Sequence, residues 1–351
     1  MVVSQKIITW YRKNARILPW RKTRDPYRIW LSEIILQQTR VTQGLPYYNN
    51  FIQKFPNVKS LASAQEKTVM KTWQGLGYYT RAGNLHKTSK IIVNQYNEKF
   101  PPDYNAILKL PGIGPYTAAA IASFAFNLPF PVVDGNVKRF LSRYFGIGRS
   151  GSIFSVEKKY LEKAQQMMSN LEPCLFNQAI MEFGALQCVP RNPVCDSCII
   201  KHGCFAFNNN LVGSLPVRVP KKKLRSRYFN YFLLCRNGKT AIRKRTEDDI
   251  LKNLYEFPMI ETNRRMSSAF IKNSELYRNL FRYPDKTTLK PAEFLVQRLS
   301  HQVIHASFWN VAYKERNGFR YKNWIWVPAG KISNYPVPGM IEKFLRHYKV
   351  G

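Results

Sequence analysis

The chain has 351 residues, of which 45% are hydrophobic, enough for two domains that each bury a core. It has no apolar run near the roughly eighteen residues of a membrane span. Its amphipathic N-terminus lacks the features of a signal peptide, so we expect no membrane partner and a cytoplasmic location. The 55 Lys and Arg against 21 Asp and Glu give a net charge of +34, which favours nucleic acid as the partner. A general coding bias toward Lys, Asn and Ile is the alternative source of part of that charge.

Residues 1–212 are predicted to form a mainly helical domain. Asp25 followed by Pro26 is typical of a helix start, and apolar residues then recur at helical spacing over residues 27–38. Similar patterns predict helices over residues 64–73, 81–96, 115–126, 136–145, 156–168 and 176–183. No comparable alternation of strands occurs in this part of the chain.

Glu33 interrupts the nearly continuous apolar segment of residues 29–36. A carboxylate in such surroundings needs either a partner or a chemical role, and burial would raise its pKa. A buried ion pair with an arginine is one interpretation of this residue. A protonated catalytic acid is the other.

Residues 104–126 have the pattern of two helices joined by a hairpin, with the sequence LPGIGPYT at 110–117. Gly112 and Gly114 permit a tight turn, and the N-terminus of the second helix then points its amides outward. The glycines alone would also suit an ordinary inter-helix turn. The flanking helices favour a site for the phosphate backbone of DNA.

Asp134 lies between an apolar run and a predicted helix that carries Lys138, Arg139 and Arg143. On local sequence alone, an aspartate at this place is more often a helix N-cap than a functional group. Together with Glu33 it suggests another role. A carboxyl group with a raised pKa and a second carboxylate are the pair that cleaves a glycosidic bond.

Four of the six cysteines, Cys188, Cys195, Cys198 and Cys204, lie within seventeen residues. Cysteines clustered in a cytosolic chain indicate metal ligation. One central Cys-x2-Cys pair with a single cysteine on each side fits a [4Fe–4S] cluster, whose corners one short segment can reach. A structural zinc site is the alternative.

Residues 213–227 are predicted to be a basic linker, because six of the ten residues from 218 to 227 are Lys or Arg. Residues 228–351 are predicted to be an α+β domain. Strands are expected over 228–236, 239–245, 300–313 and 324–327, and helices near 291–298 and 338–348.

Taken together, the chain resembles the helix–hairpin–helix DNA glycosylases that carry an iron–sulfur cluster, and within them it is similar to the adenine DNA glycosylases. The resemblance covers nearly the whole chain. It is carried by LPWR at 18–21, SEIILQQTRV at 32–41, WQGLGYYTRAGNLH at 73–86, LPGIGPYT at 110–117, VDGNV at 133–137, FNQAIMEFGALQC at 176–188 and the cysteine loop. IRKR at 242–245 and LKNLYEFP at 251–258 resemble a Nudix fold. The clustered glutamates of a catalytic Nudix box are missing, which implies recognition of the lesion in place of hydrolysis.

The resemblance implies a monofunctional glycosylase that flips adenine out of the duplex. Glu33 would protonate adenine N7, and Asp134 would stabilise the oxocarbenium ion, with Tyr116 and Asn136 beside them. Tyr116 stands where the related endonuclease III has a lysine nucleophile, so no Schiff base is expected.

The resemblance also implies the substrate and the residues that bind it. The partner would be double-stranded DNA that contains adenine opposite 8-oxoguanine or guanine, bound by a monomer in the bacterial cytosol or nucleoid. Related thymine or uracil mismatch glycosylases, and a non-catalytic DNA-binding remnant, are the alternatives. The substrate-binding residues would be Arg16 and Gln178 at the adenine, Gln37, Gln38, Thr39 and Tyr78 around the opposing base, and Ser300 and His301 at the lesion. Leu299 replaces the aromatic residue that the family commonly has before Ser300.

Overall fold

The computed structural model describes residues 2–148, 152–217, 224–281, 283–313 and 324–348. The chain folds into two compact units. The first unit comprises Met1–Ser63 and Asn84–Pro220, and the second comprises Ala64–Gly83 and Lys221–Gly351. The expected domain boundaries at residues 212 and 228 stay a prediction, and most of the basic linker, residues 218–223, lies outside the described residues.

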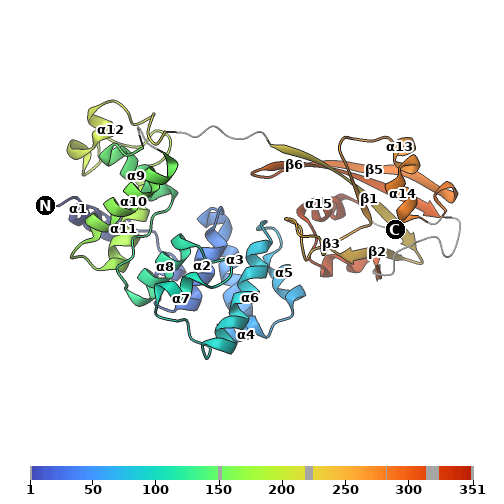
Figure 1. Ribbon diagram of the computed structural model, residues 1–351, viewed down its shortest axis with the longest axis horizontal. Coiled ribbons are helices and arrows are strands. Elements are labelled where there is room, and N and C mark those ends of the chain that lie inside the picture. Colours follow the sequence, from blue (N-terminus) through green and yellow to red (C-terminus); the bar gives the residue numbers. More distant parts are fainter. Residues whose placement is uncertain (1, 149–151, 218–223, 282, 314–323, 349–351) are drawn as a thin grey trace. The chain divides into compact units, whose positions relative to one another are not determined.

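The first unit is helical, as predicted (Figure 1). Among the described residues, no helix is long and apolar enough to cross a membrane. The helices of the first unit are α1 (Val3–Asn14), α2 (Pro26–Leu36), α3 (Val41–Lys54), α4 (Val58–Ala62), α7 (Tyr104–Leu108), α8 (Pro115–Phe126), α9 (Gly135–Phe145), α10 (Ile153–Met168), α11 (Pro173–Leu186) and α12 (Phe205–Asn208), while α6 (Thr80–Gln95) begins in the second unit and continues into the first.

Aspartate side chains cap the starts of α2 and α7. The side chain of Asp25 accepts a hydrogen bond from the amide of Tyr27 and starts α2, as the sequence predicts. Asp103 caps α7 in the same way. These caps satisfy amides that the helix cannot pair internally, so they fix the residue at which each helix begins.

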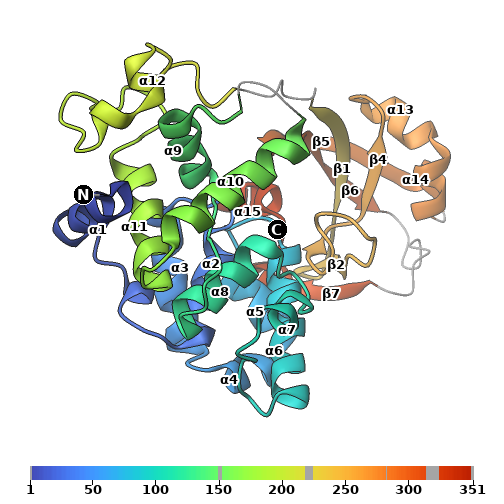
Figure 2. The ribbon, with the colours of Figure 1, turned by 60° about the vertical axis from the view of Figure 1, so that its left-hand side comes forward.

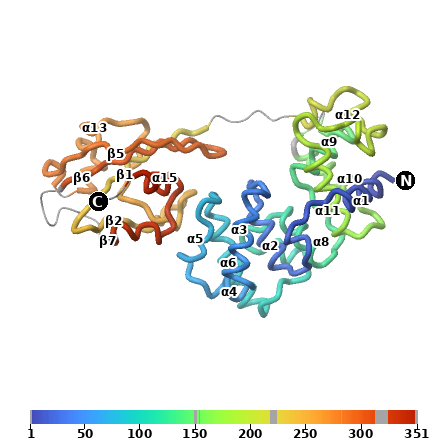
Figure 3. Tube along the Cα trace, turned by 180° about the vertical axis from the view of Figure 1, so that it is seen from behind, coloured from blue at the N-terminus to red at the C-terminus, as the bar shows by residue number. Residues whose placement is uncertain are grey.

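The small-residue helix α8 forms the centre of the first unit. Its residues from Thr117 to Phe124 are all buried, because their small side chains allow neighbouring helices to approach closely. It packs against α2 and α11, as Figures 1 and 3 show. The helices that carry Glu33, Tyr116 and Gln178 are therefore held against one another.

The second unit is built on a seven-stranded mixed sheet. The strand order is β3-β2-β1-β6-β5, with β4 added to β1 and β7 added to β2; β1 and β6 are parallel, and the other pairs are antiparallel. The strands are β1 (Arg225–Arg236), β2 (Lys239–Lys244), β3 (Tyr255–Glu256), β4 (Met259–Thr262), β5 (Thr287–Arg298), β6 (Gln302–Tyr313) and β7 (Ile325–Pro328).

Helices cover both faces of this sheet. On one face, α13 (Ser268–Asn273) and α14 (Glu275–Leu280) pack on Phe232 and Trp309. Figure 2 shows these two helices on the same side of the strands. On the other face, Phe344 of α15 (Gly339–His347) stacks on Phe308 with ring centroids 4.1 Å apart.

One element prediction was wrong. Residues 291–298 were expected to be a helix. They form the end of β5, which pairs with β6 through residue 303. Pro291 lies where the strand register shifts, at a bulge, a position where its missing amide costs no ladder hydrogen bond.

The helix α5 (Glu66–Trp73) packs within the second unit although it lies early in the sequence. Glu66 forms an ion pair of 2.7 Å with Lys244 on β2. The ammonium of Lys67 lies 3.4 Å from the ring centroid of Tyr335. The second unit therefore combines the sheet with a segment that the sequence places inside the helical half.

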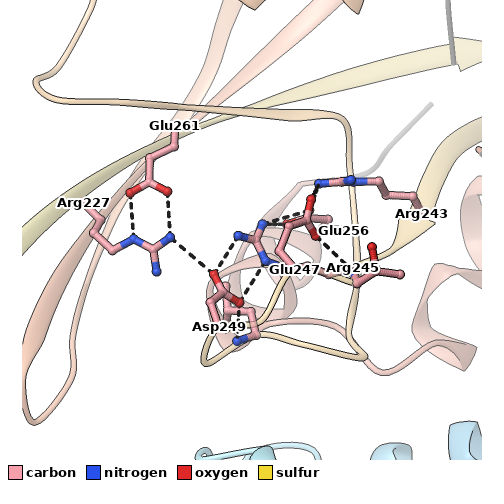
Figure 4. Close-up of polar contacts among 9 residues, drawn as sticks. Arg227, Arg243, Arg245, Glu247, Asp249, Glu256 and Glu261 are labelled. Atoms are coloured by element: carbon pink, nitrogen blue, oxygen red, sulfur yellow. Dashed lines mark hydrogen bonds and ion pairs between the residues drawn. The ribbon is translucent and has the colours of Figure 1, made fainter.

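An ion-pair network links β1, β2, β3 and β4 (Figure 4). Arg245 binds both Glu256 and Asp249, at 3.0 and 2.7 Å, and Glu256 has no exposed side-chain surface. Arg227 joins Asp249 to Glu261, and Arg243 joins Glu256 to Glu247. Each of the four carboxylates in this network has an arginine partner.

Candidate active site

The first unit contains a cavity of about 190 Å³ between α2, α8, α9 and α11. Seven of the residues predicted from sequence line it together, although they come from all parts of the first unit: Arg16, Glu33, Thr39, Tyr116, Asp134, Asn136 and Gln178. The volume suits a single flat group of the size of a nucleobase. The predicted residues Gln37, Gln38, Tyr78, Ser300, His301, Gly112 and Gly114 lie outside its lining.

Glu33 is buried on α2, with 7% of its surface exposed. Burial raises the pKa of this carboxyl to about 7, although a hydrogen bond from the Tyr116 hydroxyl, 2.9 Å from Glu33 Oε2, acts in the opposite direction. The expected alternative was a buried ion pair with an arginine. Arg16 and Arg21, which line the same cavity, bind Glu182 instead.

Asp134 is both a helix cap and a cavity residue. Its side chain accepts hydrogen bonds from the amides of Asn136 and Val137, at 2.9 and 2.7 Å, and so starts α9. The side-chain amide of Asn136 donates a third bond of 2.7 Å to it. Burial raises the pKa of Asp134, whereas these three bonds favour its charged form. Glu33, in contrast, accepts one hydrogen bond among the described contacts.

A hydrogen-bonded arginine fixes the orientation of Asn136. Arg139 donates to Asn136 Oδ1 at 2.9 Å and to the carbonyl of Gly184 at 2.7 Å, so the Asn136 nitrogen faces Asp134. A Cβ atom on Gly184 would lie 2.6 Å from the carbonyl oxygen of Asn136. The glycine therefore allows α11 to approach the start of α9.

Sequence reasoning missed the acid that organises the opposite wall. Glu182 on α11 is fully buried and accepts hydrogen bonds from Arg16, at 2.8 and 2.6 Å, and from Arg21, at 2.6 Å. Burial would raise its pKa, but the two arginines lower it to about 2. Its signal was a charged residue within the apolar segment of residues 179–186, the same signal that Glu33 gives.

The amide of Gln178 is held from both ends. The Tyr11 hydroxyl donates to Gln178 Oε1 at 2.7 Å, and Gln178 Nε2 donates to the sulfur of Cys174 at 3.2 Å. Tyr11 and Cys174 were not among the predicted site residues. They place the amide of Gln178 at the cavity wall.

The residues predicted to surround the opposing base belong partly to the first unit and partly to the second. In the first unit, Gln37 Nε2 donates to Thr117 Oγ1 at 3.2 Å, and Gln38 has a left-handed φ of 56° in the turn after α2. In the second unit, the Tyr78 hydroxyl donates to the hydroxyl of Ser300. Tyr78 also has a left-handed φ, of 49°, a conformation that costs free energy in a non-glycine residue.

The hairpin between α7 and α8 has the predicted form. Gly112 has a φ of +77°, and a Cβ atom there would lie 2.6 Å from Cβ of Asn84. Gly114 is exposed at the N-cap of α8. The unpaired amides at this helix start can therefore bind an anion.

The four predicted cysteine ligands line one cavity of about 30 Å³ in the first unit. Arg143 is buried beside it and donates to the Cys188 sulfur at 3.5 Å and to the carbonyls of Val189 and Leu215 at 2.7 and 3.0 Å. Burial raises the pKa of the Cys198 thiol to about 11.

The four thiols are the kind of donor that both expected metal groups require. Among the residues that the structure describes, no three His, Cys, Asp or Glu side chains form a group that could hold a metal ion. Four cysteine thiolates are the ligand set of a structural zinc site. A [4Fe–4S] cluster binds each of four sulfurs at a different corner, so four thiols that line one cavity also fit such a cluster.

Comparisons with known proteins agree with this geometry. Residues 31–166 match the family described as "HhH-GPD superfamily base excision DNA repair protein", and residues 230–347 match "NUDIX domain". A protein of Buchnera aphidicola subsp. Schizaphis graminum named "Adenine DNA glycosylase" is 36% identical over 355 residues, which cover 99% of each chain. A human protein of the same name is 39% identical over 209 residues, which cover 57% of this chain and 38% of that protein.

Two solved structures share the helical fold. A thermostable thymine-DNA glycosylase is 31% identical, with a TM-score of 0.54 over 59% of this chain and 95% of that one. Endonuclease III in a non-covalent complex with DNA is 22% identical, with a TM-score of 0.50 over 60% of this chain and 99% of that one. The second likeness shows the fold alone.

Proposed function

Since the chain belongs to the adenine DNA glycosylase family, we propose that it excises adenine paired with 8-oxoguanine or guanine from duplex DNA during base excision repair. The observation that carries this proposal is the pair of carboxyl groups in one nucleobase-sized cavity. Glu33 has a pKa of about 7, and Asp134 accepts three hydrogen bonds that favour its charge. One group is thereby suited to donate a proton and the other to stabilise a cation.

In the proposed reaction, the adenine is flipped into the cavity, and protonated Glu33 donates its proton to adenine N7. Protonation makes the base a better leaving group, so the N-glycosidic bond breaks with positive charge developing on the sugar. The carboxylate of Asp134 stabilises that charge, and water completes the hydrolysis. Tyr116 holds Glu33 at the cavity wall during these steps.

The opposite wall supports recognition of adenine. A glutamine amide carries both a hydrogen-bond acceptor and a donor, so it can accept from the N6 amino group of adenine while N7 is left to Glu33. Gln178 presents such an amide, tethered by Tyr11 and Cys174. Arg16, bound to Glu182 and still more than a third exposed, lies at the same wall and can contact the base or its phosphate.

The proposed enzyme releases the base without cutting the strand. Strand cleavage by a glycosylase needs an amine that forms a Schiff base with the sugar. None of the described residues that line the cavity is a lysine, and Tyr116 occupies the position after the hairpin glycines.

The opposing base would be read by the second unit. The Tyr78 and Ser300 hydroxyls lie together there, although 222 residues separate them in sequence, and His301 is exposed beside Ser300. We infer that these groups contact 8-oxoguanine, with Gln37, Gln38 and Thr39 of the first unit entering the duplex at the same base pair. Gly112 and Gly114 would bind the phosphate backbone.

We also propose that Cys188, Cys195, Cys198 and Cys204 hold a [4Fe–4S] cluster. When bound, the cluster would cross-link the loop of residues 188–204 and leave no iron position open to substrate. Arg143 would keep that loop on α9 through its bonds to the carbonyls of Val189 and Pro190. We further propose a monomer that acts on duplex DNA in the bacterial cytosol or nucleoid.

Base release on defined duplexes tests the function. The protein is incubated with duplexes that hold A opposite 8-oxoguanine, A opposite G or T opposite G, and abasic sites are then cut with hot alkali. We expect cleavage of the adenine strand only after alkali, and none with Glu33→Gln. Preferred release of thymine would instead assign the activity of the structural neighbour. Strand cleavage without alkali would contradict the monofunctional mechanism.

A further inference from the structure

One face of the second unit's sheet carries aromatic side chains that the proposed reaction does not use. Tyr228 on β1 stacks on His305 on β6, with ring centroids 4.6 Å apart and an angle of 11° between the rings. Phe294 on β5 continues the stack, 6.3 Å from His305 at 20°. We call these three side chains the aromatic row.

The strand register explains why the row forms. Tyr228 lies opposite His305 in the parallel pair of β1 and β6. Phe294 lies opposite Ser307, two residues along β6 from His305 and therefore on the same face of the sheet. The row thus crosses three neighbouring strands.

Helices α13 and α14 pack on one half of this face of the sheet and do not cover the other half, where the aromatic row lies. Helices α13 and α14 contact the part of the face around Leu289 and Trp309. In Figure 1 they lie toward the end of β5 and β6 that is remote from the hairpin between these strands. Each ring of the row is only partly buried, and Val296, which lies opposite His305, is 51% exposed.

Positive charge accompanies the row. The guanidinium of Arg265 lies 4.1 Å from the ring centroid of Phe294, and Arg298 is exposed at the end of β5 on the same face. Neither arginine forms an ion pair within the described part of the chain. None of the residues that β1, β4, β5 and β6 place on this half of the face is acidic.

The rings offer their edges to a ligand. Tyr228 and Phe294 each turn one face toward His305, and Arg265 lies over the ring of Phe294. The edge of an aromatic ring carries positive potential, whereas its face is negative. Ring edges together with two unpaired guanidinium groups suit the phosphate backbone of a nucleic acid better than they suit stacked bases.

The row also continues a surface already assigned to DNA. Ser300 and His301 form the turn between β5 and β6, and His305 is four residues further along β6. At about 3.4 Å per residue, that separation is about 14 Å, or roughly four base-pair steps along a duplex.

We propose that this face is a second DNA contact, on which the strand that leaves the Ser300–His301 turn places its phosphates against Arg265, Arg298 and the edges of the aromatic row. The proposal rests on one part of the proposed function, namely that the Ser300–His301 turn contacts DNA. It does not depend on which base is excised.

Salt dependence of binding tests it, because each phosphate contact contributes about 0.9 to the slope of log K against log salt concentration. The full chain would be titrated with a duplex that extends about ten base pairs beyond an abasic-site analogue opposite 8-oxoguanine, a ligand that cannot turn over. Arg265→Ala with Arg298→Ala should flatten the slope by about 1.8. That change corresponds to roughly 60-fold weaker binding at 0.1 M salt if binding at 1 M salt is unchanged.

A pair of lysines provides the matched control. Lys331 and Lys343 are exposed and carry the same charge outside the row. Lys331→Ala with Lys343→Ala should leave the slope nearly unchanged. Equal flattening by both pairs would show that overall charge drives binding, and no flattening by the arginine pair would show that the face is not used; either result overturns the proposal.

Two further measurements separate this proposal from folding and from catalysis. Arg265→Gln with Arg298→Gln removes the charge but keeps a polar side chain with the first methylene groups, and should give the same flattened slope as the alanine pair, with an unchanged thermal midpoint. Base release at saturating protein should also be unchanged, since neither arginine lines the active-site cavity. A wild-type chain that releases no adenine but keeps the slope difference would refute the proposed function and leave this inference standing.

Discussion

Replacing Glu33 by Gln should stabilise the fold while it abolishes base release. The Glu33 carboxyl has a pKa of about 7 in the folded chain against an ordinary value of 4.5. At 1.36 kcal/mol per pH unit, the difference corresponds to about 3 kcal/mol. Between these two pH values the folded chain binds one more proton than the unfolded chain, so the stability of the wild type falls as pH rises through this window. The penalty is complete above pH 7.

The assay compares denaturant unfolding of the wild type and Glu33→Gln from pH 4.5 to pH 8. Glutamine does not titrate, so the variant should gain up to about 3 kcal/mol relative to the wild type as pH rises. Glu162→Gln, at an exposed position on α10, is the control and should show almost no such trend. Wild-type base release should fall about tenfold from pH 6 to pH 8, as the acid loses its proton. A difference in stability that is independent of pH would refute the reasoning.

Three other substitutions test the surroundings of the site and the second unit. Gly184→Ala should lower the free energy of unfolding by about 1–3 kcal/mol and slow base release, because the new Cβ would meet the Asn136 carbonyl. The control Gly83→Ala, whose Cβ meets nothing within 4 Å, should be neutral or slightly stabilising in the same unfolding and kinetic assays. Cys198→Ser should lower bound iron and sulfide per chain in chemical analysis, and Cys235→Ser, at an exposed cysteine of the second unit, should not. Arg245→Met should destabilise the second unit by about 3–5 kcal/mol, since it leaves the buried Glu256 without one of its arginines. The control Lys252→Met removes an exposed ion pair and should cost less than about 1 kcal/mol. Retention of stability by Arg245→Met would contradict a role for the network in folding.

Local chemistry made much of the helical unit predictable. The Asp25–Pro26 start of α2 and the hairpin before α8 follow from caps and glycines that act within a few residues. The β5 segment could not be predicted in the same way. Its pairing with β6 is decided by a partner strand across the turn, so a segment expected to be helical forms a strand.

The sequence singled out both carboxyl groups of the proposed catalytic pair and the residues that bind them, Tyr116 and Asn136, but not the acid that organises the opposite wall of the cavity. Glu33 was conspicuous because it is charged within an apolar segment. Glu182 gave a similar signal, but its arginine partners are more than 160 residues away in sequence, and nothing local indicates that they meet. Asp134 shows that two interpretations of one residue can both hold, since it caps α9 and lines the cavity.

Glu33 and Asp134 contribute differently to the stability of the fold, and this difference affects any screen of variants. Because burial raises its pKa, Glu33 should lower the stability of the fold near and above neutral pH, and Glu33→Gln should make the chain more robust. Asp134 supports the start of α9, but asparagine is an equally good cap, so Asp134→Asn preserves the helix and removes the charge. A screen that selects variants by thermal tolerance or by yield of soluble chain would therefore retain both kinds of inactive enzyme, and would enrich the first.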